Sequence, residues 1–336
     1  MTNKTPIDIQ PLGFPWKTKD PFLFCAHHAD KYPKGNVHMG PEVPLNGRSL
    51  GSDFSGKDGW SMYHGQTVPG FPAHPHKGFE TVTIVRTGLV DHSDSLGAAA
   101  RFGNGDVQWM TAGKGVQHSE MFPLLKREEE NPFELFQIWL NLPKVGKLAD
   151  PYFSMLWSEK LPVFEIGEGE KKTEITIIAG DLGSLSALAP PPDSWAADPG
   201  HEVTIWTIKM TPGAKWTLPV ASAEAGRMLY FFKGHSLKVE ELETTSYKSI
   251  ELNADVPVIL ENGPEESHLL LLQGRPIKEP VIQYGPFVMN SEHEIHQTIQ
   301  EYQQTQFGGW PWKSHDNVHG NRGRFAKHAD GKEEIK

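Results

Sequence analysis

Cysteine and long apolar runs are the two features that this chain of 336 residues most clearly lacks. Cys25 is the single cysteine, so no internal disulfide can form, which is typical of a reducing compartment. The amino terminus has no apolar core of signal-peptide length, and nowhere do about eighteen uncharged apolar residues follow one another, as a membrane span requires. These absences predict a soluble cytoplasmic protein, or a nuclear one if the source is eukaryotic, without a membrane partner. In its apolar context, "FLFCAHH", the thiol is expected to be buried and inert.

Positive charge is also in short supply. Thirty-two Lys and Arg face 42 Asp and Glu, which gives a formal net charge of −10. Such a balance argues against direct binding of nucleic acid or of an anionic membrane surface. The basic stretch "GNRGRFAKH" near the carboxyl terminus is too short to change that expectation.

Turn-forming residues, in contrast, are plentiful and evenly spread. The 33 glycines and 27 prolines separate short apolar runs that are rich in β-branched and aromatic residues. The runs before residue 145 lie at 80–87, 107–113, 117–122 and 133–142, and a second series follows residue 162. This rhythm predicts an all-β protein, built as a sandwich or a barrel, with two consecutive β-domains. The stretch 291–304 is the clearest helix, because Ser291 and Glu294 form a capping box before an apolar stripe.

Two pairs of polar residues repeat the spacing of a strand face. In "AHPHKGFE", His74 and His76 point to the same side of a strand, and Pro75 suits an edge strand near its entrance. In "GVQHSEMF", His118 and Glu120 have the same spacing. If the two strands are neighbours, three imidazoles and one carboxylate converge.

Such a ligand set suits a divalent first-row metal. Open coordination positions favour Fe(II), whereas zinc would be satisfied by four ligands alone, and manganese, nickel and copper remain open. The competing interpretation makes His74 and His76 surface loop residues and His118 a hydrogen-bonded core residue.

Longer blocks around these residues resemble the pirin family of the cupin superfamily. They are "FPAHPHKGFETVTIVRTG", "GDVQWMTAGKGVQHSEM", "EPVIQYGPFVMNSEHEI" and the shorter "DPFLF", and the likeness spans roughly residues 20–305. The resemblance implies a bicupin, in which two β-barrels (double-stranded β-helices) face each other. It also implies one iron per chain in the amino-terminal barrel, on His74, His76, His118 and Glu120. Glu80, a ligand in other cupins, would have a supporting or structural role.

The resemblance suggests three parts. These are a metal-binding cupin domain at 1–145, a metal-free cupin domain at 146–306 and a polar tail at 307–336. In the second part Trp216, Thr217 and Leu218 stand where an H-x-H pair would be, and His235 and His268 are single. The insertion at 33–66, within a loop-like stretch 33–72, is expected to be functional or disordered. The tail histidines, His315 and His319, are expected to be flexible, and His293 and His296 on the helix to be solvated.

Family members show quercetin 2,3-dioxygenase activity, so the resemblance implies a dioxygenase that uses Fe(II), dioxygen and a flavonol-like small molecule. Glu120 is then the catalytic residue, which would either leave the metal or accept the substrate hydroxyl proton, and Trp109, Met121 and Phe122 would line the pocket. The alternative is an iron-dependent redox-sensing regulator of the transcription-cofactor type, which binds a protein partner. A third interpretation is a structural bicupin whose metal only ties two strands together.

Overall fold

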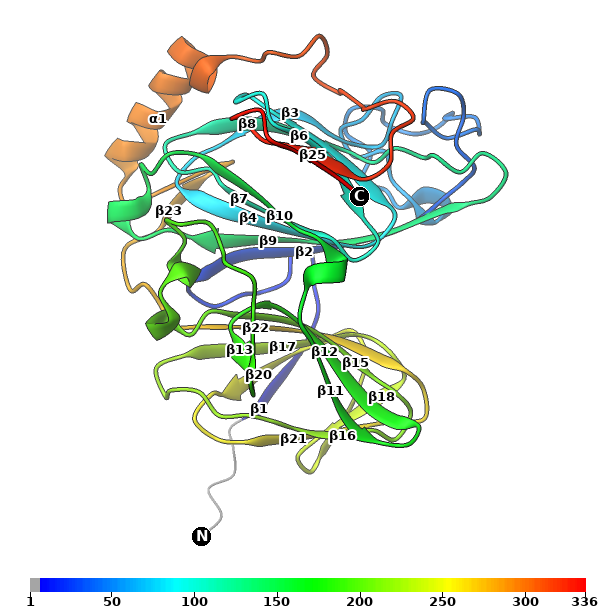
Figure 1. Ribbon diagram of the computed structural model, residues 1–336, viewed down its shortest axis with the longest axis vertical. Coiled ribbons are helices and arrows are strands. Elements are labelled where there is room, and N and C mark those ends of the chain that lie inside the picture. Colours follow the sequence, from blue (N-terminus) through cyan, green and yellow to red (C-terminus); the bar gives the residue numbers. More distant parts are fainter. Residues whose placement is uncertain (1–6) are drawn as a thin grey trace. The chain divides into compact units, whose positions relative to one another are not determined.

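The computed structural model describes residues 7–336 and consists of β-strands with one α-helix among the described residues (Figure 1). The strands form two compact units. The first barrel comprises Ala26–Ser158 and Glu279–Lys336, and the second comprises Glu159–Lys278 with the described residues 7–25. The all-β fold with two barrels and a short carboxy-terminal helix is therefore confirmed. The division of the chain at 145/146 and 306/307 stays a prediction. In the structure the amino-terminal segment belongs to the second barrel and the carboxy-terminal segment to the first, which that division does not include.

Two sheets build the first barrel. One contains, in spatial order, β10 (Tyr152–Leu156), β7 (Val107–Thr111), β4 (Phe79–Thr87), β9 (Asn131–Asn141) and β2 (Phe22–Tyr32). The other contains β26 (Glu333–Ile335), β25 (Phe325–Lys327), β6 (Ala99–Gly103), β5 (Leu89–Asp94), β8 (Val116–Met121) and β3 (Gly70–His76). The strands expected at 80–87, 107–113, 117–122 and 133–142 are thus present as β4, β7, β8 and β9. Apolar side chains from both sheets, such as Val85 and Phe102, meet in one buried cluster.

The segment 33–66 is ordered around a buried arginine. Arg48 Nη1 donates to Asp53 Oδ2 and to the Trp60 carbonyl oxygen, both at 2.9 Å, and its guanidinium lies 3.3 Å from the centroid of the Trp60 ring. A short 3₁₀ turn, η1 (Lys57–Gly59), lies in this segment. A Cβ added at Gly40 would lie 2.0 Å from the Thr67 carbonyl oxygen. The glycines therefore permit close backbone contact, and the expectation of disorder is wrong.

The carboxy-terminal residues form strands instead of a flexible tail. β25 pairs antiparallel with β6, and β26 pairs with β25. The fully buried Arg101 donates Nη1 to the carbonyl oxygens of Gly320 and Arg322, each at 2.7 Å, and Trp312 Nε1 donates to Asp94 O at 2.8 Å. The flexible tail was a wrong expectation, because these contacts tie a polar segment to the edge of β6.

The helix α1 (Glu292–Thr305) begins where the capping box predicted. Ser291 Oγ accepts from the Glu294 backbone N–H at 3.3 Å, and Ser291 donates back to the Glu294 carboxylate at 2.9 Å. Ile295 is buried against the hairpin of β23 (Ile282–Tyr284) and β24 (Phe287–Met289). Among the described residues, no helix is long and apolar enough to cross a membrane.

The second barrel also has two main sheets. Its larger sheet runs β1 (Ile7–Pro11), β20 (Lys248–Asn253), β17 (Gly226–Lys233), β22 (Ser267–Gly274), β15 (Thr204–Met210), β12 (Lys171–Ala179) and β11 (Val163–Glu168). Its smaller sheet runs β16 (Lys215–Leu218), β21 (Val258–Asn262), β18 (Ser236–Val239) and β19 (Leu242–Thr245), and a hairpin of β13 (Asp181–Leu182) and β14 (Leu185–Ser186) adjoins them. Trp216 and Leu218 are buried in the apolar core, beside Leu271 of β22.

Candidate metal centre

The pairing of β3 with β8 brings the two histidine motifs together. β3 is the edge strand of its sheet, and its register with β8 places His74 opposite His118. The expected strand pairing is confirmed, and the edge position explains how Pro75 is tolerated. The expected strand entrance is wrong, because both histidines lie in the last three residues of β3. The register between β3 and β8 shifts between Phe71 and His74, and this irregularity directly precedes the first histidine of the pair.

Three imidazoles form a compact cluster. One ring nitrogen from each of His74, His76 and His118 lies within 4.8 Å of the other two. The ring centroids are 4.5 Å apart for His74 and His118 and 4.9 Å apart for His76 and His118. His118 is fully buried and His76 is 3% exposed. These three residues therefore offer convergent donor atoms in a protected site.

Burial keeps the three imidazoles neutral. It lowers the pKa of His74 to about 4 and the pKa values of His76 and His118 well below the ordinary value. His74 Nδ1 lies 2.9 Å from the Pro72 carbonyl oxygen, which can only accept, so Nδ1 carries the proton and Nε2 keeps its lone pair. Neutral imidazoles with free lone pairs are the form that binds a divalent metal.

His118 shows a second sign of a ligand site. Among the described residues, neither of its ring nitrogens has a hydrogen-bond partner, although both are buried. A buried polar group left without a partner costs about 1–3 kcal/mol. A cation bound by the three histidines would remove that cost, so the donor set fits a metal.

Glu120 lies beside this cluster and not within it. Its Oε2 is 3.7 Å from His118 Nε2 and accepts from Gln137 Nε2 at 3.2 Å, while Oε1 lies 3.0 Å from Thr83 Oγ1. Burial raises the pKa of its carboxyl group. The structure thus groups three of the four predicted ligands and holds the fourth side chain next to them, so the ligand role of Glu120 stays a prediction.

Three neighbours of the site were not found from the sequence. Thr83 and Gln137 lie opposite each other on β4 and β9 and both contact Glu120. His92 is fully buried, its ring centroid is 5.6 Å from that of His118, and its Nε2 lies 3.2 Å from Asp94 Oδ2. The sequence contained a signal only for Gln137, a single amide within the apolar stretch FQIWL, because Thr83 and His92 lie in strands with several other polar residues.

Aromatic rings surround the histidines. The ring of His76 lies 5.1 Å from Phe79 and 5.4 Å from Trp139, and Phe71 lies 6.3 Å from His74, between centroids. The predicted pocket residues, Trp109, Met121 and Phe122, are all buried in the first barrel. The rings that the structure places against the triad are thus different ones.

The remaining sequence candidates lie away from this cluster. Glu80 is fully buried and accepts from Thr111 Oγ1 at 2.6 Å across the β4–β7 pair, in keeping with a structural role. His293 and His296 are exposed on α1, as expected. Cys25 is fully buried, and its burial raises the pKa of the thiol.

A two-barrel cupin fold, with a compact histidine triad on one pair of strands, defines the class of this protein. The family is shown by comparison: the Pirin family model matches residues 16–140, and the model of the Pirin C-terminal cupin domain matches residues 205–308. The chain is 32% identical to human Pirin over 265 residues, which is 75% of this chain and 83% of that protein. It belongs to the pirin family.

Two further relatives bear on the chemistry. A Pseudomonas aeruginosa protein provisionally named a quercetin 2,3-dioxygenase is 34% identical over 249 residues, covering 71% of this chain and 79% of its own length. The crystal structure of a quercetin 2,3-dioxygenase from Acinetobacter baumannii is similar, with a TM-score of 0.69 and 27% identity over 86% of each chain.

Proposed function

We propose that this protein is an Fe(II)-dependent dioxygenase that cleaves flavonol-like hydroxy-ketones, with the metal held by His74, His76, His118 and Glu120. The observation that carries the proposal is the triad of convergent, neutral imidazoles, two of them buried and one half-buried, in which His118 has no hydrogen-bond partner among the described residues. The similarity to proteins named quercetin 2,3-dioxygenase supports the reaction class.

The metal suits this donor set. Nitrogen ligands with one carboxylate are typical of first-row divalent metals, and iron is favoured because the proposed reaction consumes dioxygen. Bound Fe(II) would supply open coordination positions and the ability to exchange an electron with its ligands. The chain would supply the orientation of the ligands, through Pro72 behind His74 and through Thr83 and Gln137 behind Glu120.

Glu120 is proposed as the group that accepts the substrate hydroxyl proton. Contacts with Thr83 and Gln137 fix its carboxylate beside the triad, so its position does not depend on the substrate. Phe71, Phe79 and Trp139 present flat apolar surfaces around the histidines, which suits a planar aromatic substrate and excludes water.

An aerobic assay tests this function. Iron-loaded protein is mixed with quercetin, and the loss of the flavonol absorbance is followed. Turnover is expected, and His118→Ala is expected to abolish it, whereas His296→Ala, on the exposed face of α1, should leave it unchanged.

Absence of turnover with every flavonol in a panel, by protein shown to contain iron, would overturn the enzymatic proposal. If the same protein bound a protein partner only in one oxidation state of the iron, the redox-sensing regulator would be the better account. The similarity to human Pirin is the reason for including that measurement.

A further inference from the structure

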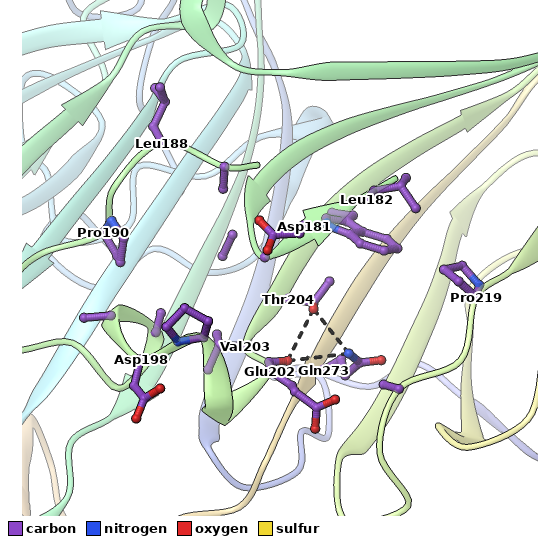
Figure 2. Close-up of a pocket in the computed structure, with 18 of the residues that line it drawn as sticks. Asp181, Leu182, Leu188, Pro190, Asp198, Glu202, Val203, Thr204, Pro219 and Gln273 are labelled. Atoms are coloured by element: carbon purple, nitrogen blue, oxygen red, sulfur yellow. Dashed lines mark hydrogen bonds between the residues drawn. The ribbon is translucent and has the colours of Figure 1, made fainter. Parts of the chain in front are cut away.

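A cavity of about 420 Å³ lies entirely within the second barrel and takes no part in the metal centre. Figure 2 shows its wall, where apolar side chains surround the space: Leu182, Leu188, Pro190, Val203 and Pro219. Its volume is within the range of pockets that hold small organic molecules.

The polar end of this cavity is built from three strands. Gln273 of β22 donates to Thr204 Oγ1 of β15 at 3.2 Å, and Figure 2 shows this contact together with the carbonyl oxygen of Glu202. Arg227 of β17 also lines the cavity, and its Nε donates to Gln273 Oε1 at 2.7 Å. The β17–β22 register pairs Arg227 with Gln273, so the sheet itself sets the position of the guanidinium.

Arg227 occupies a place where strand alternation would put an apolar residue. It lies two and four residues before Leu229 and Phe231, which belong to the barrel core, and it is only 2% exposed. Burial lowers the pKa of Arg227 to about 10, which leaves it charged at neutral pH. A buried charge is expensive unless it is paired.

Within the described residues no carboxylate forms an ion pair with Arg227, although the charges of Glu202 and Asp255 favour its charged form and partly offset the effect of burial on its pKa. Within the described part of the chain, Arg227 Nη1 has no hydrogen-bond partner, and the indole Nε1 of Trp206, on the same cavity wall, has none either. The carboxylate of Glu202 accepts from the Ser222 backbone N–H at 3.0 Å and from Arg275 Nε at 2.9 Å, so it is already occupied.

The other acidic residues of the wall lie in exposed positions. Asp181 is exposed, and Asp198 is exposed and accepts from the Gly200 backbone N–H at 2.8 Å. Among the described residues that line the cavity, Arg227 is the one with a cationic side chain. The cavity therefore offers a buried cation and an unpartnered indole donor within largely apolar walls.

We infer that the second barrel is a binding site for a small carboxylate with an apolar, preferably aromatic, body, in which Arg227 pairs with the carboxylate. Trp206 would donate to the same anion, and the apolar wall would cover the body of the ligand. This inference does not depend on the reaction proposed for the first barrel.

Benzoate tests the inference, with benzamide as its neutral counterpart. Calorimetric titration of the full-length protein is expected to show binding of benzoate and none of benzamide. Arg227→Met keeps a long side chain but removes the charge, and it should weaken benzoate binding at least about 30-fold. Its melting temperature without ligand is measured alongside, to show that the variant is folded after loss of the hydrogen bond from Arg227 to Gln273.

Two control variants make the result specific. Lys209→Met removes one positive charge from the outer face of β15, where Lys209 lies 3.7 Å from Glu174, and should bind benzoate like the wild type. His118→Ala disables the proposed metal site and should also keep benzoate binding, which separates this cavity from carboxylate binding at a metal.

Equal benzoate affinity in Arg227→Met and the wild type would overturn the inference, as would loss of binding in His118→Ala. No binding of benzoate or hexanoate by the wild type would overturn it too. If Arg227→Met does not fold, Arg227→Lys decides. Lysine keeps the charge but loses the bidentate fork, so roughly tenfold weaker binding is expected, and unchanged affinity would contradict the inference.

Discussion

His118 differs from the other histidines of the chain in how it is placed. It is fully buried, its pKa lies well below the ordinary value, and neither ring nitrogen has a hydrogen-bond partner among the described residues. His293 and His296, in contrast, are exposed on α1. Burial without a partner is costly for an imidazole, so its presence here indicates a ligand that compensates for it.

Removing His118 should therefore remove the metal. His118→Ala is expected to lower the affinity for Fe(II) by more than about 100-fold, because a direct ligand contributes more than the groups behind it. Elemental analysis of the purified variant measures this. His296→Ala should retain the wild-type metal content, and a fully loaded His118→Ala protein would contradict the proposed site.

Thr83 offers a finer test, since its hydroxyl contacts Glu120 Oε1 at 3.0 Å. Thr83→Val removes only that hydroxyl, and metal affinity should fall about 10- to 100-fold if Glu120 is a ligand. Competition with a chelator measures the change.

Thr81 of the same strand is the matched control. It is fully buried, and within the described residues its hydroxyl has no partner. Thr81→Val should leave metal affinity unchanged and should not destabilise the protein. Equal effects of the two substitutions would mean that Thr83 has no part in supporting the metal.

The sequence predicted the triad but not the residues around it. His74, His76 and His118 could be found because two-residue spacing on a strand directs side chains to one face. Thr83, Gln137 and His92 approach the site through the register between strands, which residue order alone does not contain. The same reason explains why Arg227, in a strongly apolar run, gave no signal from the sequence.

The insertion at 33–66 is an element that owes its order to polar contacts. Arg48 and Asp53 pair at 2.9 Å with both side chains at most 2% exposed. Burial by itself would raise the pKa of Asp53, but hydrogen bonds from Ser55, the Met62 backbone N–H and Arg48 lower it from 3.8 to about 2.

The pH dependence of this element follows from that shift. Because the folded pKa lies below the unfolded one, the stabilisation is complete above about pH 4 and is lost as the pH falls towards 2. Asp53→Asn should cost the segment about 2 kcal/mol at neutral pH. Hydrogen exchange of the segment measures the loss. The difference in protection between Asp53→Asn and the wild type should vanish as the pH approaches about 2.

Asp58 provides the control for this prediction. It lies 3.6 Å from Arg48 Nη2 but is 69% exposed, so Asp58→Asn should change stability by well under about 1 kcal/mol. A comparable loss of stability in Asp53→Asn and Asp58→Asn would mean that burial does not determine how much each pair with Arg48 contributes.

Element prediction succeeded where a pattern is local. The capping box of Ser291 and Glu294 located the start of α1, a β-branched run located β4, and a run of aromatic and branched residues located β9. The tail was misjudged because β25 has only three residues and its pairing with β6 joins Phe325 to Arg101, more than two hundred positions away. Polar composition alone gave no indication of that partner.

At the scale of the molecule, binding of the metal should stabilise the first barrel and leave the stability of the second barrel unchanged. Chelation is expected to reduce hydrogen-exchange protection in β3 and β8 of the first barrel and to leave β17 and β22 of the second barrel unchanged. A metal present at a thousand times its dissociation constant contributes about 4 kcal/mol to the unit that binds it. An equal loss of protection in both barrels would contradict this assignment.

Strand density along the chain predicted two consecutive β-domains, and the resemblance to pirins made them barrels, but neither predicted which barrel each terminal segment joins. β1 pairs with β20, so the start of the chain completes the second barrel, while β25 and α1, near its end, belong to the first. Such pairings link segments distant in sequence through three to five residues each. These pairings stabilise the protein only once the barrels have formed, so no local sequence pattern indicates them.

The burial of Cys25 has a practical consequence for spectroscopy. A thiol that is fully enclosed and hard to ionise reacts slowly with maleimide dyes. A cysteine introduced at an exposed position such as His296 would then be the sole labelled point under mild conditions. Pairs of such labels, one in each barrel, allow fluorescence energy transfer to follow interdomain motion without first engineering away a native sulfhydryl.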